Sequence, residues 1–320
     1  MSAVRGGAIT GWGTALPDRV VTNHDLEATM DTSDAWIVER TGIRERRVGG
    51  TTAGLSVESG RRALDMAGVS AADIDLLILA TTTPDRAVPA TSATVQHQLG
   101  LSCGAFDLNA ACTGWVYGLV AAQGFIATGA EKILLIGTDT LARITDWTDR
   151  NTAILFADGS GAAVIEAVAG DSPLLGWDLD ADGSAEEALY CDLGASLQME
   201  GREVFRRAVR IMVDSATRSM QQAGVSADDI ALVVPHQANI RIISASCDRL
   251  GIGIERAALV LDRTGNTSAA SVPLALADAL DAGRVDDGDI VLFVGFGAGM
   301  TAASAVMRWQ RTPDEGIDRS

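Results

Sequence analysis

Short apolar runs alternate with longer helical stretches along this chain. The run at residues 74–80 precedes a helical stretch at 92–99, and the run at 133–136 follows a long stretch at 108–130 that carries no charged residue. Short unbroken apolar runs are typical of strands buried on both faces, with helices covering the sheet. The pattern therefore predicts an α/β protein with a largely parallel sheet.

The hydrophobic pattern occurs twice in the chain. Two pairs of segments match: residues 69–80 (VSAADIDLLILA) with 225–235 (VSADDIALVVP), and residues 133–137 (ILLIG) with 290–295 (IVLFVG). Both pairs are separated by nearly the same number of residues, which favours duplication of one structural unit over chance. We therefore expect two similar halves, residues 1–168 and 169–320. Gly68 and Gly224 are expected to end the helix that precedes each repeat.

The uncharged stretch at 108–130 is long enough to raise the question of a membrane-spanning helix. It contains Asn109, Thr113 and Gln123 as well as several glycines, and it leads directly into the next apolar run. These residues favour a helix buried inside the protein. We expect no association with a membrane.

The acidic balance of the chain limits its partners. The 25 Lys and Arg residues are outnumbered by 42 Asp and Glu residues, which gives a formal net charge of −17. A general nucleic-acid-binding protein needs a surplus of basic residues to neutralise phosphates. We therefore expect no nucleic-acid partner, and an anionic ligand has to meet a local group of basic side chains.

The cysteines and the N-terminal residues bear on the cellular compartment. The four cysteines, Cys103, Cys112, Cys191 and Cys247, show no CxxC spacing, which favours neither a zinc site nor a disulfide framework. The first residues lack the basic stretch and apolar run of a secretory signal. We expect a cytoplasmic protein without a bound metal.

Cys112 is a candidate nucleophile. It lies in residues 107–115 (DLNAACTGW), where an apolar strand gives way to the uncharged helical stretch. The free N–H groups and the dipole at a helix start stabilise a thiolate, so we expect a lowered pKa and acyl transfer to this sulfur. A small buried cysteine with a packing role is the alternative.

Two further candidate residues lie in the second half. His236 follows an apolar run, at the carboxyl end of a predicted strand, where ligand sites gather in α/β sheets. Asn266 opens the helical stretch at 272–280, which the repeat makes the counterpart of the Cys112 helix. The duplication therefore brings these three residues together, with an N-cap role as the alternative for Asn266. The glycine-rich residues 296–300 form either a plain tight turn or an oxyanion hole.

At these residues the chain resembles the β-ketoacyl-[acyl carrier protein] synthase III family, over nearly its whole length. The segments that carry the resemblance are residues 32–44 (TSDAWIVERTGIR), 110–114 (AACTG), 236–239 (HQAN), 265–271 (GNTSAAS) and 296–299 (FGAG). Together they are far more specific than any one of them alone. The resemblance implies a thiolase-like fold, in which two βαβαβαββ halves form a five-layer αβαβα sandwich.

The resemblance also implies an acyltransferase that starts fatty acid biosynthesis. Cys112 would take an acyl group from acyl-coenzyme A (acyl-CoA), and malonyl-[acyl carrier protein] would lose carbon dioxide to give the carbanion that attacks it. His236 and Asn266 would stabilise the enolate, and the backbone N–H groups of Cys112 and Ala298 would form the oxyanion hole. These donors suffice without a metal or a cofactor.

The same resemblance assigns binding residues. Those expected to contact coenzyme A are Thr32, Trp36, Arg40, Arg150, Phe205 and Asn239. Those expected to dock the carrier protein are Arg206, Arg241 and Arg249, with a solvated helix face as the alternative explanation. Val88 would close the acyl pocket of the neighbouring subunit in a homodimer, and its small side chain would admit branched or somewhat longer primers.

The chain departs from the family pattern at a few positions. Ala302 and Ala303 stand where Trp-Gly is usual, Asn151 stands where glycine is frequent, and residues 180–198 form a short segment. These departures bear on the substrate more than on the reaction. The alternative function is a related starter-unit ketosynthase or acyltransferase of polyketide or other specialised metabolism. A degradative thiolase would need a second cysteine near residues 296–300, where the sequence has none.

Overall fold

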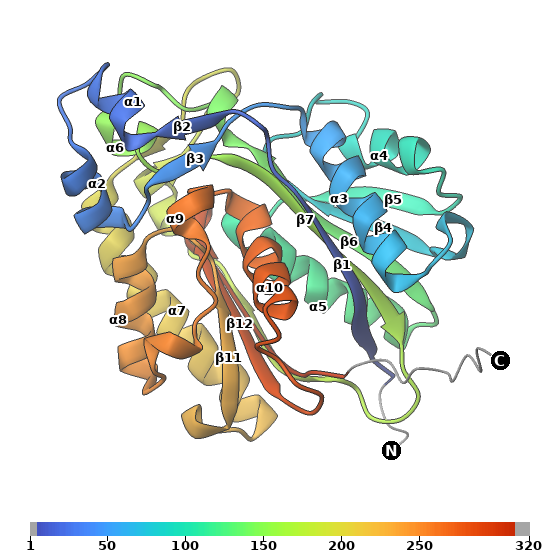
Figure 1. Cartoon of the computed structure of the whole chain (residues 1–320). Helices are drawn as coiled ribbons and strands as arrows, with labels where there is room; N and C mark the ends of the chain where they lie inside the picture. Colours follow the sequence, from blue (N-terminus) through green and yellow to red (C-terminus); the bar gives the residue numbers. More distant parts are fainter. Residues whose placement is uncertain (1–4, 311–320) are drawn as a thin grey trace.

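The protein is built from two β-sheets with helices on both sides and between them (Figure 1). A computed structural model describes residues 5–310. The first sheet has the strand order β1-β7-β6-β4-β5, and the second has the order β11-β12-β13-β8. Their strands are β1 (Gly7–Ala15), β4 (Leu76–Ala80), β5 (Gly104–Leu108), β6 (Lys132–Thr140), β7 (Asp158–Ala167), β8 (Leu174–Asp180), β11 (Ile230–Pro235), β12 (Ile290–Gly297) and β13 (Thr301–Arg308).

Helices form three layers around and between the sheets (Figure 1). Helices α3 and α4 pack on the first sheet, whereas α7 packs on the second sheet and against α8. Helices α5 and α10 contact strands of both sheets. The five-layer α/β/α/β/α arrangement is therefore confirmed. The main helices are α3 (Thr52–Ala67), α4 (Thr91–Leu99), α5 (Gly114–Ala127), α7 (Gly201–Ala223), α8 (Ile240–Leu250) and α10 (Ser271–Asp281).

Smaller elements complete the chain. They are β2 (Val20–Thr22), α1 (Asn23–Glu27), α2 (Asp34–Thr41), β3 (Glu45–Arg47), α6 (Arg150–Ala153), β9 (Leu189–Tyr190), β10 (Gln198–Met199) and α9 (Leu261–Thr264). Strands β2 and β3 pair with each other, as do β9 and β10. Four of these elements, α2, α6, β9 and β10, supply part of the walls of the cavities described below.

Strand directions are mixed in both sheets. Strand β4 runs parallel to β5 and β6, whereas β7 runs antiparallel to β1 and β6. In the second sheet β11 and β12 are parallel, and β13 runs antiparallel to both of its neighbours. The prediction of a largely parallel sheet was therefore wrong. An apolar run indicates that a strand is buried on both faces, but it does not indicate the direction of the strand. Here helices cover both faces of antiparallel strands as well as of parallel ones.

The order of elements repeats along the chain. The first half runs β1-α3-β4-α4-β5-α5-β6-β7, and the second runs β8-α7-β11-α8-α10-β12-β13. Helices α3 and α7 both end at a glycine with a left-handed backbone, Gly68 and Gly224. The counterpart of β5 is reduced to one β-bridge at Ala257, because η6 (Ile254–Arg256) takes up the preceding residues. A boundary near residue 168 stays a prediction, which this matching order supports.

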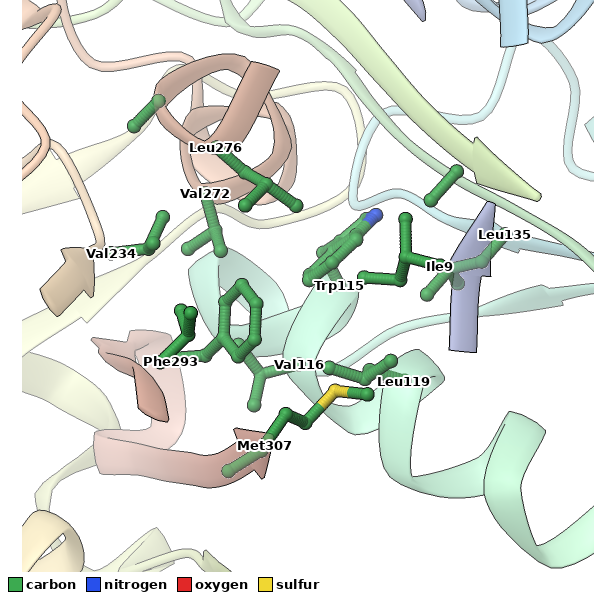
Figure 2. Packing of buried hydrophobic residues seen from close by; sticks show 14 of the residues in the cluster. Ile9, Trp115, Val116, Leu119, Leu135, Val234, Val272, Leu276, Phe293 and Met307 are labelled. Atoms are coloured by element: carbon green, nitrogen blue, oxygen red, sulfur yellow. The ribbon is translucent and has the colours of Figure 1, made fainter. Parts of the chain in front are cut away.

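Apolar packing in the middle layer joins the two halves (Figure 2). Trp115 of α5 is fully buried, and its ring centroid lies 5.6 Å from that of Phe293 on β12. Val272 of α10 and Met307 of β13 belong to the same buried cluster. Helix α5 carries no charged residue because its neighbours on both sides are sheets. Across residues 5–310, no helix has both the length and the apolar character needed to cross a membrane.

Candidate active site

Segments that follow strands of both sheets meet between the two halves. The segment after β5 carries Cys112, and His236 directly follows β11. Asn266 precedes α10 and forms a β-bridge with Phe156 of the first half. Cys112, His236 and Asn266 line one cavity, as the duplication predicts.

Cys112 lies immediately before α5, at the start of the middle layer. It belongs to the short helix η2 (Ala111–Thr113), whose first residue has a left-handed backbone with φ of 50°. The end of β12 passes directly against it, since a Cβ atom at Gly297 would lie 2.8 Å from the Cys112 nitrogen. Only glycine allows this approach without displacing the Cys112 backbone.

Burial dominates the acidity of the Cys112 thiol. Desolvation raises the pKa of Cys112 to about 12, opposed by a hydrogen bond from the Ser268 side chain and reinforced by the charge of Asp139. The lowered pKa expected from the helix start is therefore wrong for the ligand-free protein. Loss of hydration of the thiolate outweighs the favourable helix start.

His236 is buried at the end of β11 and has one polar side-chain partner. Its Nδ1 lies 2.6 Å from Oγ of Ser271, the first residue of α10. The ring packs edge-on against Phe296, with centroids 5.5 Å apart. Burial lowers the pKa of His236 to about 3, so the ring is neutral near pH 7.

The first half of the chain holds Asn266 in place. Its backbone N–H donates to the Leu155 carbonyl at 2.8 Å, and its carbonyl accepts from the Ala157 N–H at 2.9 Å. The side-chain oxygen accepts from the Ser268 backbone N–H at 2.9 Å, just before α10. The amide oxygen therefore binds the first N–H of η7 (Ser268–Ala270), whose N-cap residue is Thr267, while the amide NH₂ group stays available to a ligand. The alternative of an N-cap role for Asn266 was therefore wrong, because Thr267 and Ala270 are the N-cap residues of η7 and α10.

A buried carboxylate ties the two halves together behind these residues. Oδ1 of Asp139, at the end of β6, accepts hydrogen bonds from backbone and hydroxyl groups of residues 81–83. Its Oδ2 accepts from the Ala269 backbone N–H at 3.1 Å. Ala269 occupies in η7 the place that Cys112 occupies in η2. The part of the chain that the structure describes holds no group of three or more His, Cys, Asp or Glu side chains placed for a metal.

The first of two cavities at Cys112 has a volume of about 740 Å³ and also contains His236 and Asn266. Aromatic, polar and basic side chains line much of the rest: Trp36, Arg40, Arg150, Arg202, Phe205, Asn239 and Arg241. The cavity therefore offers a local basic surface in a chain of net charge −17. An anionic ligand can be attracted there despite the acidic protein.

Trp36 is flanked by two guanidinium groups in this cavity. The Cζ atoms of Arg40 and Arg150 each lie 4.7 Å from its ring centroid. Arg150 also donates to the Asp31 carbonyl at 2.7 Å, and Asn239 donates to the Arg40 carbonyl at 2.9 Å. These contacts gather an aromatic ring and two cations at one place, a combination suited to a planar ligand that carries negative charge, although a ligand that stacks on the ring has to displace a guanidinium group from it.

The second cavity at Cys112 has a volume of about 640 Å³. Its walls include residues 82–87 and 189–195, together with Ser268 and Ala298. Apolar side chains near the middle of the fold contribute a large part of the lining: Leu141, Ile144, Phe156, Leu189 and Leu197. An acyl chain attached to the Cys112 sulfur can be accommodated against these side chains.

Among the residues predicted to contact coenzyme A or to close the acyl pocket, Thr32 and Val88 line neither of the two cavities at Cys112. The hydroxyl of Thr32 is buried without a hydrogen-bond partner, beside the segment that leads into α2. Val88 is 83% exposed and lies just beyond the cavity wall formed by residues 82–87. A role for Val88 in the pocket of a neighbouring subunit stays a prediction.

The three arginines predicted to dock the carrier protein differ in their surroundings. Arg241 lies at the first cavity, with its Cζ 5.4 Å from the ring centroid of Phe205. Arg206 is 73% exposed and pairs with Glu203, one turn earlier in α7. Arg249 is exposed near the end of α8, with no ion pair within residues 5–310. Only Arg241 joins the cavity directly.

Three residues at the site were not identified from the sequence: Asp139, Ser268 and Ser271. Asp139 follows a recognised apolar run, so a search for polar residues at the carboxyl end of every buried strand would have found it. The two serines lie in a recognised segment, residues 265–271. No pattern in that segment shows which serine faces Cys112 and which faces His236.

Comparisons with known proteins agree with this geometry. A family model described as 3-oxoacyl-[acyl-carrier-protein (ACP)] synthase III matches residues 106–183, and the model of its C-terminal part matches residues 220–309. The Bacillus anthracis protein named β-ketoacyl-[acyl-carrier-protein] synthase III 1 is 47% identical, across 94% of this chain and 98% of that protein. This chain belongs to the β-ketoacyl-[acyl carrier protein] synthase III family.

Solved structures extend the comparison for this synthase III chain. The crystal structure of 3-oxoacyl-[acyl-carrier-protein] synthase III from Aquifex aeolicus has a TM-score of 0.93 and 42% identity, and the match covers 95% of this chain and all of that one. A priming β-ketosynthase from the R1128 polyketide biosynthetic pathway has a TM-score of 0.91 and 35% identity over 98% and 99% of the two chains. Synthase III relatives therefore include a polyketide enzyme.

Alkylation of the ligand-free synthase III chain with iodoacetamide tests the raised pKa of Cys112. Because burial disfavours the thiolate, its fraction is small at pH 7 and the alkylation rate should rise about tenfold per pH unit up to about pH 10. Peptide mass spectrometry separates Cys112 from the exposed Cys191, and Cys112→Ser supplies the blank. A rate that levels off near neutral pH would show instead a thiolate stabilised by the helix start.

Replacing Asp139 with Asn tests the buried hydrogen bonds by which the Asp139 carboxylate joins residues 81–83 to Ala269. The variant places an NH₂ group opposite either the Ala269 N–H or the donors of residues 81–83, so a buried donor loses its acceptor. We expect a loss of about 2 kcal/mol or more in the free energy of unfolding, measured by urea denaturation. Asp75→Asn is the matched control, because one exposed Asp75 oxygen accepts both of its backbone hydrogen bonds and should cost less. Equal losses would argue against a special role for Asp139.

Proposed function

We propose that this synthase III chain condenses an acyl-CoA primer with malonyl-[acyl carrier protein] and releases 3-ketoacyl-[acyl carrier protein], which initiates fatty acid biosynthesis. The observation that carries the proposal is that Cys112 lines a basic cavity and a partly apolar cavity, beside two neutral hydrogen-bonding side chains. A sulfur in this position can take an acyl group from an anionic carrier and keep the acyl chain in a separate space.

In the first half-reaction, the Cys112 sulfur attacks the thioester carbonyl of acyl-CoA. The backbone N–H groups of Cys112 and Ala298 are assigned to the developing oxyanion, supported by the close approach of β12 to the Cys112 backbone. The bond between the acyl carbon and the coenzyme A sulfur breaks, and the proton lost by Cys112 ends on the coenzyme A thiol. The overall step is therefore balanced without a histidine base, in agreement with the strongly lowered pKa of His236.

In the second half-reaction, malonyl-[acyl carrier protein] occupies the cavity that coenzyme A has left. The bond to its carboxylate breaks, carbon dioxide leaves, and the electron pair moves onto the thioester as an enolate. His236 and Asn266 are assigned as donors to the enolate oxygen, each contributing about 3 kcal/mol to the lowering of the barrier. The enolate carbon then attacks the acyl group, and Cys112 leaves as thiolate.

The basic cavity is assigned to coenzyme A. Trp36 offers an aromatic face for the adenine ring, and the cations of Arg40 and Arg150 offer charge to the phosphates. Phe205 and Asn239 line the same cavity nearer to α7 and α8, where the pantetheine arm would pass. Thr32 belongs to this set by resemblance alone.

The carrier protein is proposed to dock on the exposed arginines of α7 and α8, Arg206, Arg241 and Arg249. All three side chains are exposed and Arg241 lines the basic cavity, so an acidic partner would find on these helices the positive charge that the whole chain lacks. The ion pair between Arg206 and Glu203 must open or rearrange before Arg206 can bind a partner carboxylate. Arg241 and Arg249 are therefore the better docking candidates.

Assembly and location are proposed from the family. We propose a cytoplasmic homodimer in which Val88 of one subunit closes the acyl pocket of the other, with neither metal nor cofactor in the reaction. Val88 and Leu193 are exposed apolar side chains that a second subunit could cover. A valine at the pocket leaves room for branched or somewhat longer primers than a bulky aromatic would.

A starter-unit ketosynthase of polyketide metabolism is the second candidate function. The R1128 priming β-ketosynthase shares the fold over nearly its full length, so the site chemistry suits either pathway. Both functions begin with acylation of Cys112 and differ in the carrier protein that receives the product. Carrier preference therefore separates them.

Intact-mass measurement of acylation tests the assigned trio. The protein is incubated with straight and branched acyl-CoA thioesters from acetyl to decanoyl. Cys112→Ala should give no adduct, whereas His236→Ala and Asn266→Ala should acylate normally and lose about 100-fold or more in decarboxylative condensation with malonyl-[acyl carrier protein]. An adduct on the Cys112→Ala protein would show that the nucleophile is wrongly assigned. An adduct inert to malonyl-[acyl carrier protein] but discharged to another nucleophile would favour an acyltransferase.

Replacing Arg150 with Ala tests the coenzyme A assignment. The variant removes one cation from the face of Trp36, so the KM for acyl-CoA should rise about tenfold, with little change in kcat. The same variant is assayed with an acyl-pantetheine thioester, which lacks the nucleotide and should be used equally well by both proteins. A parallel loss with both substrates would mean that Arg150 supports the fold of α6 and α2 and does not bind the nucleotide.

A further inference from the structure

Ser271 lies between the ring of His236 and the backbone of the next residue. Its Oγ is 2.6 Å from Nδ1 of His236 and accepts a hydrogen bond from the Gln237 backbone N–H at 3.3 Å. Ser271 is 1% exposed, so its hydroxyl is shielded from bulk water. Other groups of the protein therefore decide whether the hydroxyl donates its hydrogen to Nδ1 of His236 or accepts one from it.

The N–H group of Gln237 is fixed by the side chain of the same residue. Its amide NH₂ donates to the carbonyls of Pro235 and Ala258, at 2.7 and 3.0 Å. Its amide oxygen accepts from two further backbone N–H groups. With all of these bonds formed in the interior, the Gln237 backbone cannot turn its N–H away from Ser271, and one lone pair of the serine oxygen is permanently occupied.

The Ser271 hydroxyl hydrogen has one acceptor available within residues 5–310, which is Nδ1 of His236. If Nδ1 carried a hydrogen, the serine oxygen would accept from both His236 and Gln237, and its own hydrogen would be buried without a partner. Buried polar groups without partners are strongly disfavoured. The arrangement that satisfies every group has Ser271 donating to Nδ1.

A neutral imidazole carries one hydrogen, so an accepting Nδ1 leaves that hydrogen on Nε2. The structure gives Nε2 no protein partner among the residues it describes, and the ring lines the cavity shared with Cys112 and Asn266. Burial favours the neutral ring and lowers its pKa. His236 therefore presents an N–H donor to a ligand in the cavity.

We infer that Ser271 is a positioning residue that keeps the hydrogen of His236 on Nε2, where it can be donated to the enolate oxygen. The inference deepens the proposed function and rests on it for the use of that hydrogen. When the malonyl carbon–carbon bond breaks and carbon dioxide leaves, negative charge develops on the thioester oxygen. An Nε2–H stabilises this charge, whereas a hydrogen on Nδ1 would leave the Nε2 lone pair facing it. No proton is transferred to or from the ring.

The position of the hydrogen is measured by NMR on the full-length chain labelled with ¹⁵N-histidine. The sequence has only His24, His97 and His236, and the signals absent from His236→Ala identify the third. We expect the wild-type ring to carry its hydrogen on Nε2 at pH 7. In Ser271→Ala both tautomers should be populated, because Nδ1 has lost the donor that selects one of them.

Kinetics on the same proteins separate the two half-reactions. Ser271→Ala should lower kcat for condensation about 10- to 100-fold, while the rate of Cys112 acylation changes less than about twofold. Ser271→Thr retains the hydroxyl and should restore most of the condensation rate. Ser215→Ala is the matched control, because it removes another buried serine hydroxyl, bonded to Ser304 at 3.0 Å, away from the site. It should leave the His236 tautomer and both rates unchanged.

A wild-type spectrum with the hydrogen on Nδ1 would overturn the inference. Unchanged tautomer and condensation in Ser271→Ala would overturn it as well. If Ser271→Ala does not fold, the wild-type spectrum and the Ser271→Thr protein still test the role of the hydroxyl. A wild-type protein that acylates but never condenses would refute the proposed function instead, and the spectrum would still decide what Ser271 does to the His236 ring.

Discussion

The packing of α5 and α10 between the two sheets is the constraint on which the rest of the structure depends. Trp115 of α5 packs against Phe293 of the second sheet, so neither half has a complete core alone. The starts of both helices lie at the site, where they carry Cys112 and Ser271. Because the whole protein core sets the position of these starts, the groups proposed to react are placed by regular elements of the fold.

Duplication has given the two helix starts different tasks. The backbone is left-handed at Ala111 and at Ser268, with φ of 50° and 51°, so η2 and η7 begin in the same way. The first copy carries the proposed nucleophile Cys112, and Ala269 stands at the matching place in the second. In the second copy the Ala269 backbone N–H donates a hydrogen bond to Asp139. Asn266, which precedes η7, lines the cavity. One copy supplies the Cys112 sulfur and the other supplies backbone and side-chain groups around it.

The sequence predicts this architecture where a pattern reports burial or repetition. Apolar runs located β4, β6, β11 and β12, and the repeat placed Asn266 opposite Cys112. Strand direction was not predicted correctly, because β7 and β13 are as deeply covered by helices as a parallel strand would be. The pKa of Cys112 depends on how far the hydration lost by the buried thiolate outweighs the favourable helix start. The burial of the side chain decides this balance, and burial is known only from the folded structure. The contact of Ser271 with His236 likewise joins residues that no spacing rule connects.

The two cavities differ in how their walls are built. Cys112, His236 and Asn266 stand on helix starts and strand ends tied to the core, whereas residues 191–195 of the second cavity belong to a connecting segment. Connecting segments accept substitutions and changes of length at little cost in folding. Under the proposed function, a change of primer can therefore arise in the wall around the acyl chain while the groups around the Cys112 sulfur stay the same.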